Sequence, residues 1–408
     1  PHMCDGLKPS QRKVVFACMK RNLTQELKVA QLSGYISEVS AYHHGEVSLQ
    51  GAIIGMAHDY VGSNNINLLA PCGQFGTRLM GGKDSASSRY IFTKLSKVTT
   101  SIFDPRDNST LKFLDDDGKA IEPEYYMPVI PMILVNGGEG IGTGYSTQIP
   151  SYNPEDIKAN LVKCMNGEAP TPMVPWYKGF RGTVTRKDDT SWTLTGKYEL
   201  KVGKGIYITE LPPGKWTQDY KEFLDGLAEK GKIESYSNHS TEETPKFTIK
   251  GYTGHDIIKE LGLSKTIHTT NMWLMTPRGM KKYSSPEEII VDYFQYRFKH
   301  YKQRKKNLLK EFKFQAELAS TKARFVREVV EERFLIFKRK KADIENDLDK
   351  GKYMKVQNSY DYLMGIRTSQ YTLEAIANLN KEQADKTTSY NKLLKITELD
   401  MWKNDLNF

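Results

Sequence analysis

The sequence predicts an α+β protein of several domains: a helix-turn-helix domain, a strand-rich α/β domain, and a long antiparallel coiled coil that ends in a helical tip. Three patterns indicate this. Apolar residues recur at helical spacing over about residues 9–62, apolar and polar residues alternate over about 176–283, and neither Pro nor Gly occurs between Pro286 and Gly351. With 408 residues, of which 38% are hydrophobic, the chain can fill two or three separate cores.

The first domain is expected over residues 4–130 and begins with short helices. Val14 and Cys18 lie one helical turn apart, as do Leu32 and Ile36 further along the chain. In a helix-turn-helix fold, one of the later helices meets DNA. A generic small helical domain would show the same apolar spacing, so the pattern alone does not establish DNA binding.

The second domain is expected over residues 131–283. Helices are predicted near 154–166 and 217–230, and the apolar run Met132-Ile-Leu-Val135 is predicted to be a strand. The clearest alternation occurs in Trp192–Thr195, Gly205–Thr209 and Lys246–Lys250. This domain concentrates no acid, base or metal-ligand cluster, so we expect a platform rather than an active site.

The third region is expected over residues 284–408. Ser285 with Pro286 and Glu288 has the composition of a helix start, and a very long helix should follow. Its antiparallel partner is predicted at about 381–396, with a small helical tip over roughly 335–378. Such an arm buries little against a compact body, so its tip is expected to contact a second copy of the chain.

Composition narrows the classes of partner. The formal net charge of +10 makes an acidic polymer a plausible partner, although a lysine-rich solvated surface gives the same count. The four cysteines form no Cys-x-x-Cys pair, which argues against a zinc knuckle or a disulfide framework. No apolar run approaches the ~20 residues of a membrane helix. Residues 1–3, Pro-His-Met, are expected to be a cloning scar on an excised fragment.

The dipeptide Arg89-Tyr90 lies in a segment of small and cationic residues that begins at Gly81. A tyrosine hydroxyl can act as a nucleophile when adjacent cations or a metal activate it, and arginine binds phosphate with planar, bidentate geometry. The pair therefore fits covalent phosphate chemistry. Arg-Tyr is also a common dipeptide, and these two residues alone do not decide between the two interpretations.

Six short motifs occur in one order along the chain: Asp5–Lys13, Ala41–Glu46, Gln74–Arg78, Gly81–Asp84, Arg89-Tyr90 and Glu139–Gly144. Their order and spacing resemble the breakage and reunion region of eukaryotic-type type IIA DNA topoisomerases, viral enzymes included. The resemblance continues through Thr209–Pro212 to Met401–Leu406 and so covers nearly the whole chain. One departure is Ser10, where relatives usually carry Gly.

The resemblance implies a winged-helix domain over 4–130, a tower domain over 131–283, and a coiled coil with a dimerisation gate over 284–408. It implies that Tyr90 forms a 5′-phosphotyrosine with DNA and that Arg89 stabilises the transferring phosphate. The residues implied to lie along bound DNA are Lys8, Arg12, Lys13, Tyr42, His43, His44, Ser48, Arg78, Lys83, Ile141 and Trp216. In relatives, the isoleucine at the place of Ile141 wedges between base pairs. Each of these residues also has a plain structural alternative, such as a solvated helix start or a helix-turn histidine.

Two other motifs suggest ligands that we do not expect. Glu139–Gly144 is glycine-rich, but no helix follows at once to hold a pyrophosphate, so a dinucleotide loop is rejected. Asp115-Asp-Asp-Gly118 is expected to be a hairpin turn rather than a magnesium site, because three consecutive carboxylates cannot all face one ion. No metal site is therefore expected in this chain.

The resemblance further implies that Mg²⁺ and ATP serve the full-length enzyme at sites outside this chain, and that this fragment binds neither and is inactive alone. The expected partners are double-stranded DNA and a second copy of the chain, bound through the coiled-coil tip and the winged-helix region, with no membrane. The expected location is the nucleus for a cellular source, and the host cytoplasm or virion for a viral one. Two rivals remain: an architectural dimer that bends and bridges DNA without cutting it, and a coiled-coil scaffold without nucleic acid.

Overall fold

The computed structural model describes residues 1–408 as two compact units. Unit 1 comprises Pro1–His300 with Lys403–Phe408, and unit 2 comprises Tyr301–Trp402. The helix that begins at Pro286 belongs to unit 1 in its first part and to unit 2 in the rest. None of the helices is long and apolar enough to cross a membrane.

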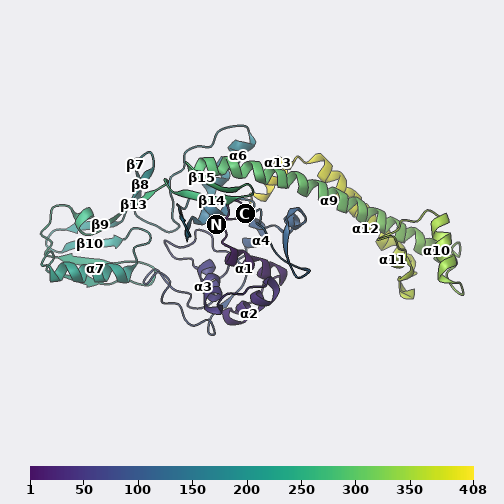
Figure 1. Ribbon diagram of the computed structural model, residues 1–408, viewed down its shortest axis with the longest axis horizontal. Helices are drawn as coiled ribbons and strands as arrows, with labels where there is room; N and C mark the ends of the chain where they lie inside the picture. Colours follow the sequence, from purple (N-terminus) through teal and green to yellow (C-terminus); the bar gives the residue numbers. More distant parts are fainter. The chain divides into compact units, whose positions relative to one another are not determined.

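Unit 1 begins with three packed helices, α1 (Pro9–Lys20), α2 (Val29–Ser40) and α3 (Glu46–Ala57), which cluster in Figure 1. Their apolar stripes form one core, with Val14, Leu32, Ile36, Leu49 and Ile53 all fully buried. The predicted helical spacing over this region is confirmed. Each stripe has period 3.6, so each helix can bury only one face.

Short elements complete this part of unit 1. They are β1 (Leu27–Lys28), β2 (Phe92–Thr93), α4 (Thr99–Ile102), the 3₁₀-helix η1 (Pro105–Thr110), β3 (Phe113–Asp116) and β4 (Lys119–Pro123). β1 pairs antiparallel with β2, and β3 with β4. The turn between β3 and β4 has Asp117 and Gly118 at positive φ, as the predicted hairpin requires.

The prediction of a strand at Met132–Val135 is wrong, since these residues form the short helix α5 (Met132–Asn136). All four of these apolar side chains are buried. Periodicity cannot distinguish a buried helical turn from a buried strand in so short an apolar run. The chain then forms a hairpin of β5 (Gly138–Gly142) and β6 (Tyr145–Ile149).

The strand-rich part of unit 1 has two main sheets. One has the order β11-β12-β10-β9 and the other β13-β8-β7, with all pairings antiparallel. The strands are β7 (Thr183–Asp188), β8 (Ser191–Thr195), β9 (Lys197–Lys201), β10 (Gly205–Glu210), β11 (Ser235–Asn238), β12 (Phe247–Lys250) and β13 (Ser264–His268). The three predicted strands correspond to β8, β10 and β12.

Helices and one more hairpin accompany these sheets. The helices are α6 (Pro154–Met165), α7 (Thr217–Glu229) and α8 (Ile257–Glu260), and the hairpin is β14 (Met272–Thr276) with β15 (Gly279–Tyr283). α6 and α7 lie where the sequence predicted helices. α7 packs Tyr220 and Leu224 against Ile208 and Phe247 of the four-stranded sheet.

The first three residues pack into unit 1. Met3 is fully buried and its backbone N–H donates to the carbonyl of Met275 at 2.7 Å. His2 accepts a hydrogen bond from the Cys4 N–H at 3.1 Å and stacks on Tyr125 with ring centroids 4.5 Å apart. Residues 1–3 were expected to be a cloning scar, and in this structure they have ordinary core contacts.

Unit 2 is an arm of two long helices with a helical tip (Figure 1). Its elements are the greater part of α9 (Pro286–Val330), then α10 (Lys341–Lys350), α11 (Asp361–Met364), the 3₁₀-helix η2 (Thr368–Gln370), α12 (Leu373–Lys395) and the first part of α13 (Glu398–Asp405). Lys305 donates to the Ile396 carbonyl at 2.6 Å, and Lys386 lies over the Phe312 ring, so α9 and α12 run antiparallel.

One boundary in unit 2 differs from the prediction. α9 ends at Val330, just before the tip predicted over roughly 335–378, and Phe334 then packs with Phe325 and Leu348 in the core of the tip. α12 begins at Leu373, earlier than expected, where the Thr372 side chain accepts from the Ala375 N–H as an N-cap.

Candidate active site and nucleic-acid interface

Tyr90 combines an exposed side chain with a fixed backbone. Its side chain is 73% exposed, whereas its N–H donates to the Ser87 carbonyl at 2.9 Å. The carbonyls of Ser88 and Ile91 accept from Ala30 and Val29 at 3.1 and 3.0 Å. The last two N–H groups open α2, which has no side-chain cap, so the segment around Tyr90 supplies the missing acceptors.

A closed loop precedes Tyr90, and we call residues 74–86 the Gln74–Ala86 loop. The Ala86 N–H donates to the Gln74 carbonyl at 2.9 Å, and Asp84 accepts from the Thr77 N–H at 2.8 Å. A Cβ on Gly76 would lie 2.5 Å from the Cα of Gly82, so the two halves of the loop touch at a point where only glycine fits.

His58 and Tyr60 form a hydrogen-bonded pair that contacts the backbone of this loop. His58 Nε2 lies 2.8 Å from the Phe75 carbonyl, which can only accept, so this nitrogen donates and Nδ1 is left to accept from the Tyr60 hydroxyl at 3.3 Å. Burial lowers the pKa of His58 and raises that of Tyr60 to about 12. Both groups therefore stay neutral near pH 7 and act as hydrogen-bonding supports.

Arg78, which the resemblance implies to lie along DNA, is paired within the fold. Its side chain is only 2% exposed and forms an ion pair with the fully buried Glu210 at the end of β10. Trp216, also predicted to lie along DNA, is half-buried, and its ring packs edge-on to Tyr60 with centroids 5.6 Å apart. Both residues serve internal packing around the Gln74–Ala86 loop.

Two of the three basic residues near the chain start are also paired within the fold. Arg12 is buried and donates to Asp5 at 2.7 Å and to the Leu7 carbonyl at 2.9 Å. Lys13 forms an ion pair with Glu122 at 2.8 Å, with 15% of its side chain exposed. Their donors are already used within the fold, whereas Lys8 is exposed. The sequence shows the charges of these residues but does not indicate their ion-pair partners.

The other residues predicted to contact DNA around the start of α3 and on the Gln74–Ala86 loop are exposed or half-buried. His43, His44 and Ser48 are exposed around the start of α3, and Lys83 is exposed on the Gln74–Ala86 loop. The half-buried Tyr42 packs edge-on to the His44 ring, with centroids 5.5 Å apart. The two histidines lie in the turn before α3, at the place the sequence predicted.

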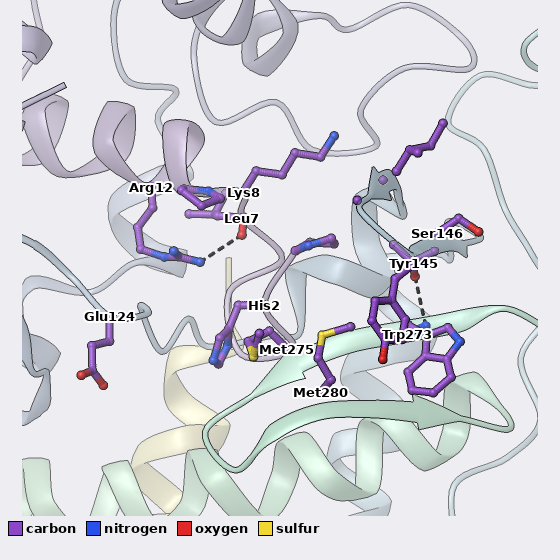
Figure 2. Close-up of a pocket in the computed structure, with 16 residues that line it drawn as sticks. His2, Leu7, Lys8, Arg12, Glu124, Tyr145, Ser146, Trp273, Met275 and Met280 are labelled. Carbon is purple, nitrogen blue, oxygen red and sulfur yellow. Dashed lines mark hydrogen bonds between the residues drawn. The ribbon is translucent and has the colours of Figure 1, made fainter. Parts of the chain in front are cut away.

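Ile141 is 95% exposed near the tip of the β5–β6 hairpin. The hairpin is held on β14, because the Trp273 N–H donates to Thr147 Oγ1 at 3.0 Å and Tyr145 packs edge-on to the Trp273 ring. A cavity of about 500 Å³ lies beside it, and Figure 2 shows the residues that line this cavity. Lys8, Arg12 and Ile141 all line this cavity, so the structure brings three predicted residues together.

The chain has no group of three or more His, Cys, Asp or Glu side chains placed to hold a metal ion. Asp115, Asp116 and Asp117 are exposed on the β3–β4 hairpin. The residues present therefore do not fit a Mg²⁺ site of the usual multi-carboxylate kind.

Comparisons with known proteins assign the family. Residues 1–407 match the family described as the A subunit of DNA gyrase/topoisomerase IV. The chain belongs to this family. It is 41% identical to DNA topoisomerase 2 of Arabidopsis thaliana and 41% identical to that of Plasmodium falciparum, in each case over 100% of the chain. The chain spans only 31% and 32% of the length of these two relatives.

A solved structure gives the same answer for the fold. The crystal structure of the Plasmodium falciparum topoisomerase II DNA-binding, cleavage and re-ligation domain is 42% identical and superposes with a TM-score of 0.94. It covers 100% of this chain, which in turn covers 60% of that chain. The predicted fold class is thereby confirmed.

Sequence reasoning missed several residues that hold the site of this member of the gyrase/topoisomerase IV family. Asp5, Asp84, Glu122 and Glu210 are acceptors for its basic and loop groups. Glu210 lies in the Thr209–Pro212 motif, so its place in a motif was a signal. Nothing in the sequence pairs it with Arg78, which lies 132 positions away.

Proposed function

We propose that this chain is the breakage and reunion portion of a type IIA DNA topoisomerase. The observation that carries the proposal is Tyr90, an exposed phenol on a fixed backbone beside the exposed Arg89. Tyr90 Oη attacks a DNA phosphorus, the new O–P bond forms, and the bond to the 3′ oxygen breaks. The phenol gives up its proton and the 3′ oxygen gains one, so the step is balanced and runs backward to reseal the strand.

The residues of this chain have separate roles in that step. Arg89 stabilises charge on the transferring phosphate through its permanently charged, bidentate group. His43, His44, Lys83 and Lys8 are exposed donors that suit phosphate contact. Ile141 is an exposed apolar wedge that suits insertion between base pairs.

The family also implies Mg²⁺ and ATP. The residues of this chain do not fit a metal site, so we assign both ligands to parts of the full-length protein outside it. The short share of its relatives that the chain spans supports a longer parent protein. The cleavage step described above uses only side chains of this chain and no metal ion or nucleotide bound to it.

The partners we propose are double-stranded DNA and a second copy of the chain. Two copies would place one Tyr90 on each strand, and paired arms of unit 2 would form the exit gate for a transported duplex. We propose the nucleus for a cellular source and the host cytoplasm or virion for a viral one. One relative, from Dictyostelium discoideum, is named as mitochondrial.

An architectural dimer that bends DNA without cutting it is the alternative. It uses the exposed cations and Ile141 equally well, but it gives no role to an exposed tyrosine beside an exposed arginine. The test is to incubate the full-length protein with supercoiled DNA, Mg²⁺ and ATP, quench with detergent, and compare it with Tyr90→Phe. We expect covalent attachment to 5′ DNA ends only with Tyr90. Equal DNA binding by both proteins, with no adduct and no relaxation, would favour the architectural dimer.

A further inference from the structure

The pair Arg78 and Glu210 joins the Gln74–Ala86 loop to the four-stranded sheet. Arg78 Nη2 donates both to Glu210 Oε1 and to the Leu211 carbonyl, the latter at 3.0 Å. Glu210 also accepts from the N–H groups of Leu211 at 2.9 Å and Arg181 at 3.1 Å. The carboxylate therefore has a partner on each oxygen, and the guanidinium is fixed by two acceptors.

Stability alone does not account for this pair. The two side chains are 2% and 0% exposed, so both charges lose their hydration when the chain folds. Well-packed apolar residues of similar volume often replace such a pair with no loss of stability. What the ion pair adds is direction, because Arg78 Nη2 must aim its two N–H bonds at two fixed acceptors, Glu210 Oε1 and the Leu211 carbonyl.

The helix α7 makes a second connection to the same loop. The first N–H groups of α7, those of Thr217 and Gln218, donate to the carbonyls of Arg78 at 3.4 Å and Leu79 at 2.9 Å. The Trp216 ring covers Gly81 so closely that a Cβ there would lie 2.4 Å from the indole. The side chain of Arg78 and the backbone beside it are thus held by consecutive parts of the sheet domain.

The loop carries this constraint to Tyr90. Its two ends meet through the hydrogen bond from Ala86 to the Gln74 carbonyl. A Cβ on the adjacent Gly73 would lie 3.1 Å from the Ile91 side chain, so the base of the loop touches the residue after Tyr90. The base of the loop thus contacts the chain on both sides of Tyr90, at Ala86 and at Ile91.

We propose that Arg78 and Glu210 are positioning residues for the cleavage step, setting the place of Tyr90 against the phosphate without touching DNA. This inference rests on the proposed function of Tyr90. Misplacing a reacting group by about 1 Å can cost on the order of 100-fold in rate. The pair should thus govern the rate of adduct formation and leave duplex affinity unchanged.

The test is the double variant Arg78→Met/Glu210→Leu in the full-length protein, assayed under single turnover with saturating duplex. We expect adduct formation to slow by about 10- to 100-fold, with the duplex Kd within about twofold of wild type. The matched control is Arg297→Met/Asp107→Leu, which removes another buried ion pair of unit 1 with 0% and 3% exposed side chains. This control should keep the wild-type rate.

Other outcomes overturn the inference. An adduct rate at the wild-type level would show that the pair has no positioning role, and a matching loss of duplex affinity would make Arg78 a DNA contact. Where the double variant fails to fold, Arg78→Lys decides, since lysine keeps the charge but lacks the planar guanidinium whose Nη2 reaches both acceptors. A slower adduct at unchanged affinity supports the inference, and a wild-type rate overturns it. If wild-type protein forms no adduct that depends on Tyr90, the proposed function itself fails.

Discussion

Gly81 is the residue at which the Gln74–Ala86 loop and the Trp216 ring come closest. Its φ is +62°, and a Cβ would lie 2.4 Å from indole Nε1. We predict that Gly81→Ala lowers the free energy of unfolding by about 2–4 kcal/mol, through left-handed strain and displacement of the ring. Gly118→Ala is the control, because its φ is +82° with no atom within 4 Å of the added Cβ. Urea unfolding followed by tryptophan fluorescence measures both, and equal losses would contradict the packing role of Gly81.

At this scale the sequence identified residue types better than residue partners. Tyr90, Arg89, Lys83 and the two histidines are exposed, as a contact with DNA would require. Arg12, Lys13 and Arg78 have the same charge in the sequence but are paired within the fold. A buried charge requires a partner, and that partner is fixed by tertiary contacts that no local pattern records.

Among the secondary-structure elements, the β5–β6 hairpin presents one of the most exposed apolar side chains of the chain. Ile141 is 95% exposed, and its removal leaves no cavity. We predict that Ile141→Ala changes the free energy of unfolding by less than about 0.5 kcal/mol but reduces the bend of bound duplex. Energy transfer between dyes at the two duplex ends measures the bend. The control is Val202→Ala, at a similarly exposed valine after β9, which should leave the bend of the duplex unchanged. An unaltered bend with Ile141→Ala would exclude a wedge.

Elements with a long periodic pattern were predictable, and short ones were not. The helices over 9–62 and the strand β10 follow clear apolar spacing because each buries one face. The turn α5 and the start of α12 do not, since neither is marked by a long apolar repeat. α12 begins at Leu373 instead of about 381, behind the N-cap Thr372, a start that the apolar pattern of the sequence did not indicate.

At the scale of the whole molecule, the proposed dimer needs a surface on which the arms of unit 2 can meet. The segment between α9 and α10 exposes Leu335 by 62% and Phe337 by 71%, an unusual exposure for large apolar side chains outside an interface. If two tips pack through this segment, a carboxylate placed there would be buried without a partner. The contact should then weaken without any loss of the fold of each chain.

We therefore predict that Leu335→Asp/Phe337→Asp raises the dimer dissociation constant by about tenfold or more. A second contact through residues 4–130 would keep self-association measurable in the variant. Sedimentation equilibrium gives the dissociation constant, and duplex binding at matched salt checks that the DNA surface is intact. Val202→Asp is the control, since it adds the same charge at an exposed valine of unit 1. If both variants dimerise as the wild type does, the tip is not the dimer contact, and the arms of unit 2 cannot form the proposed exit gate through these two residues.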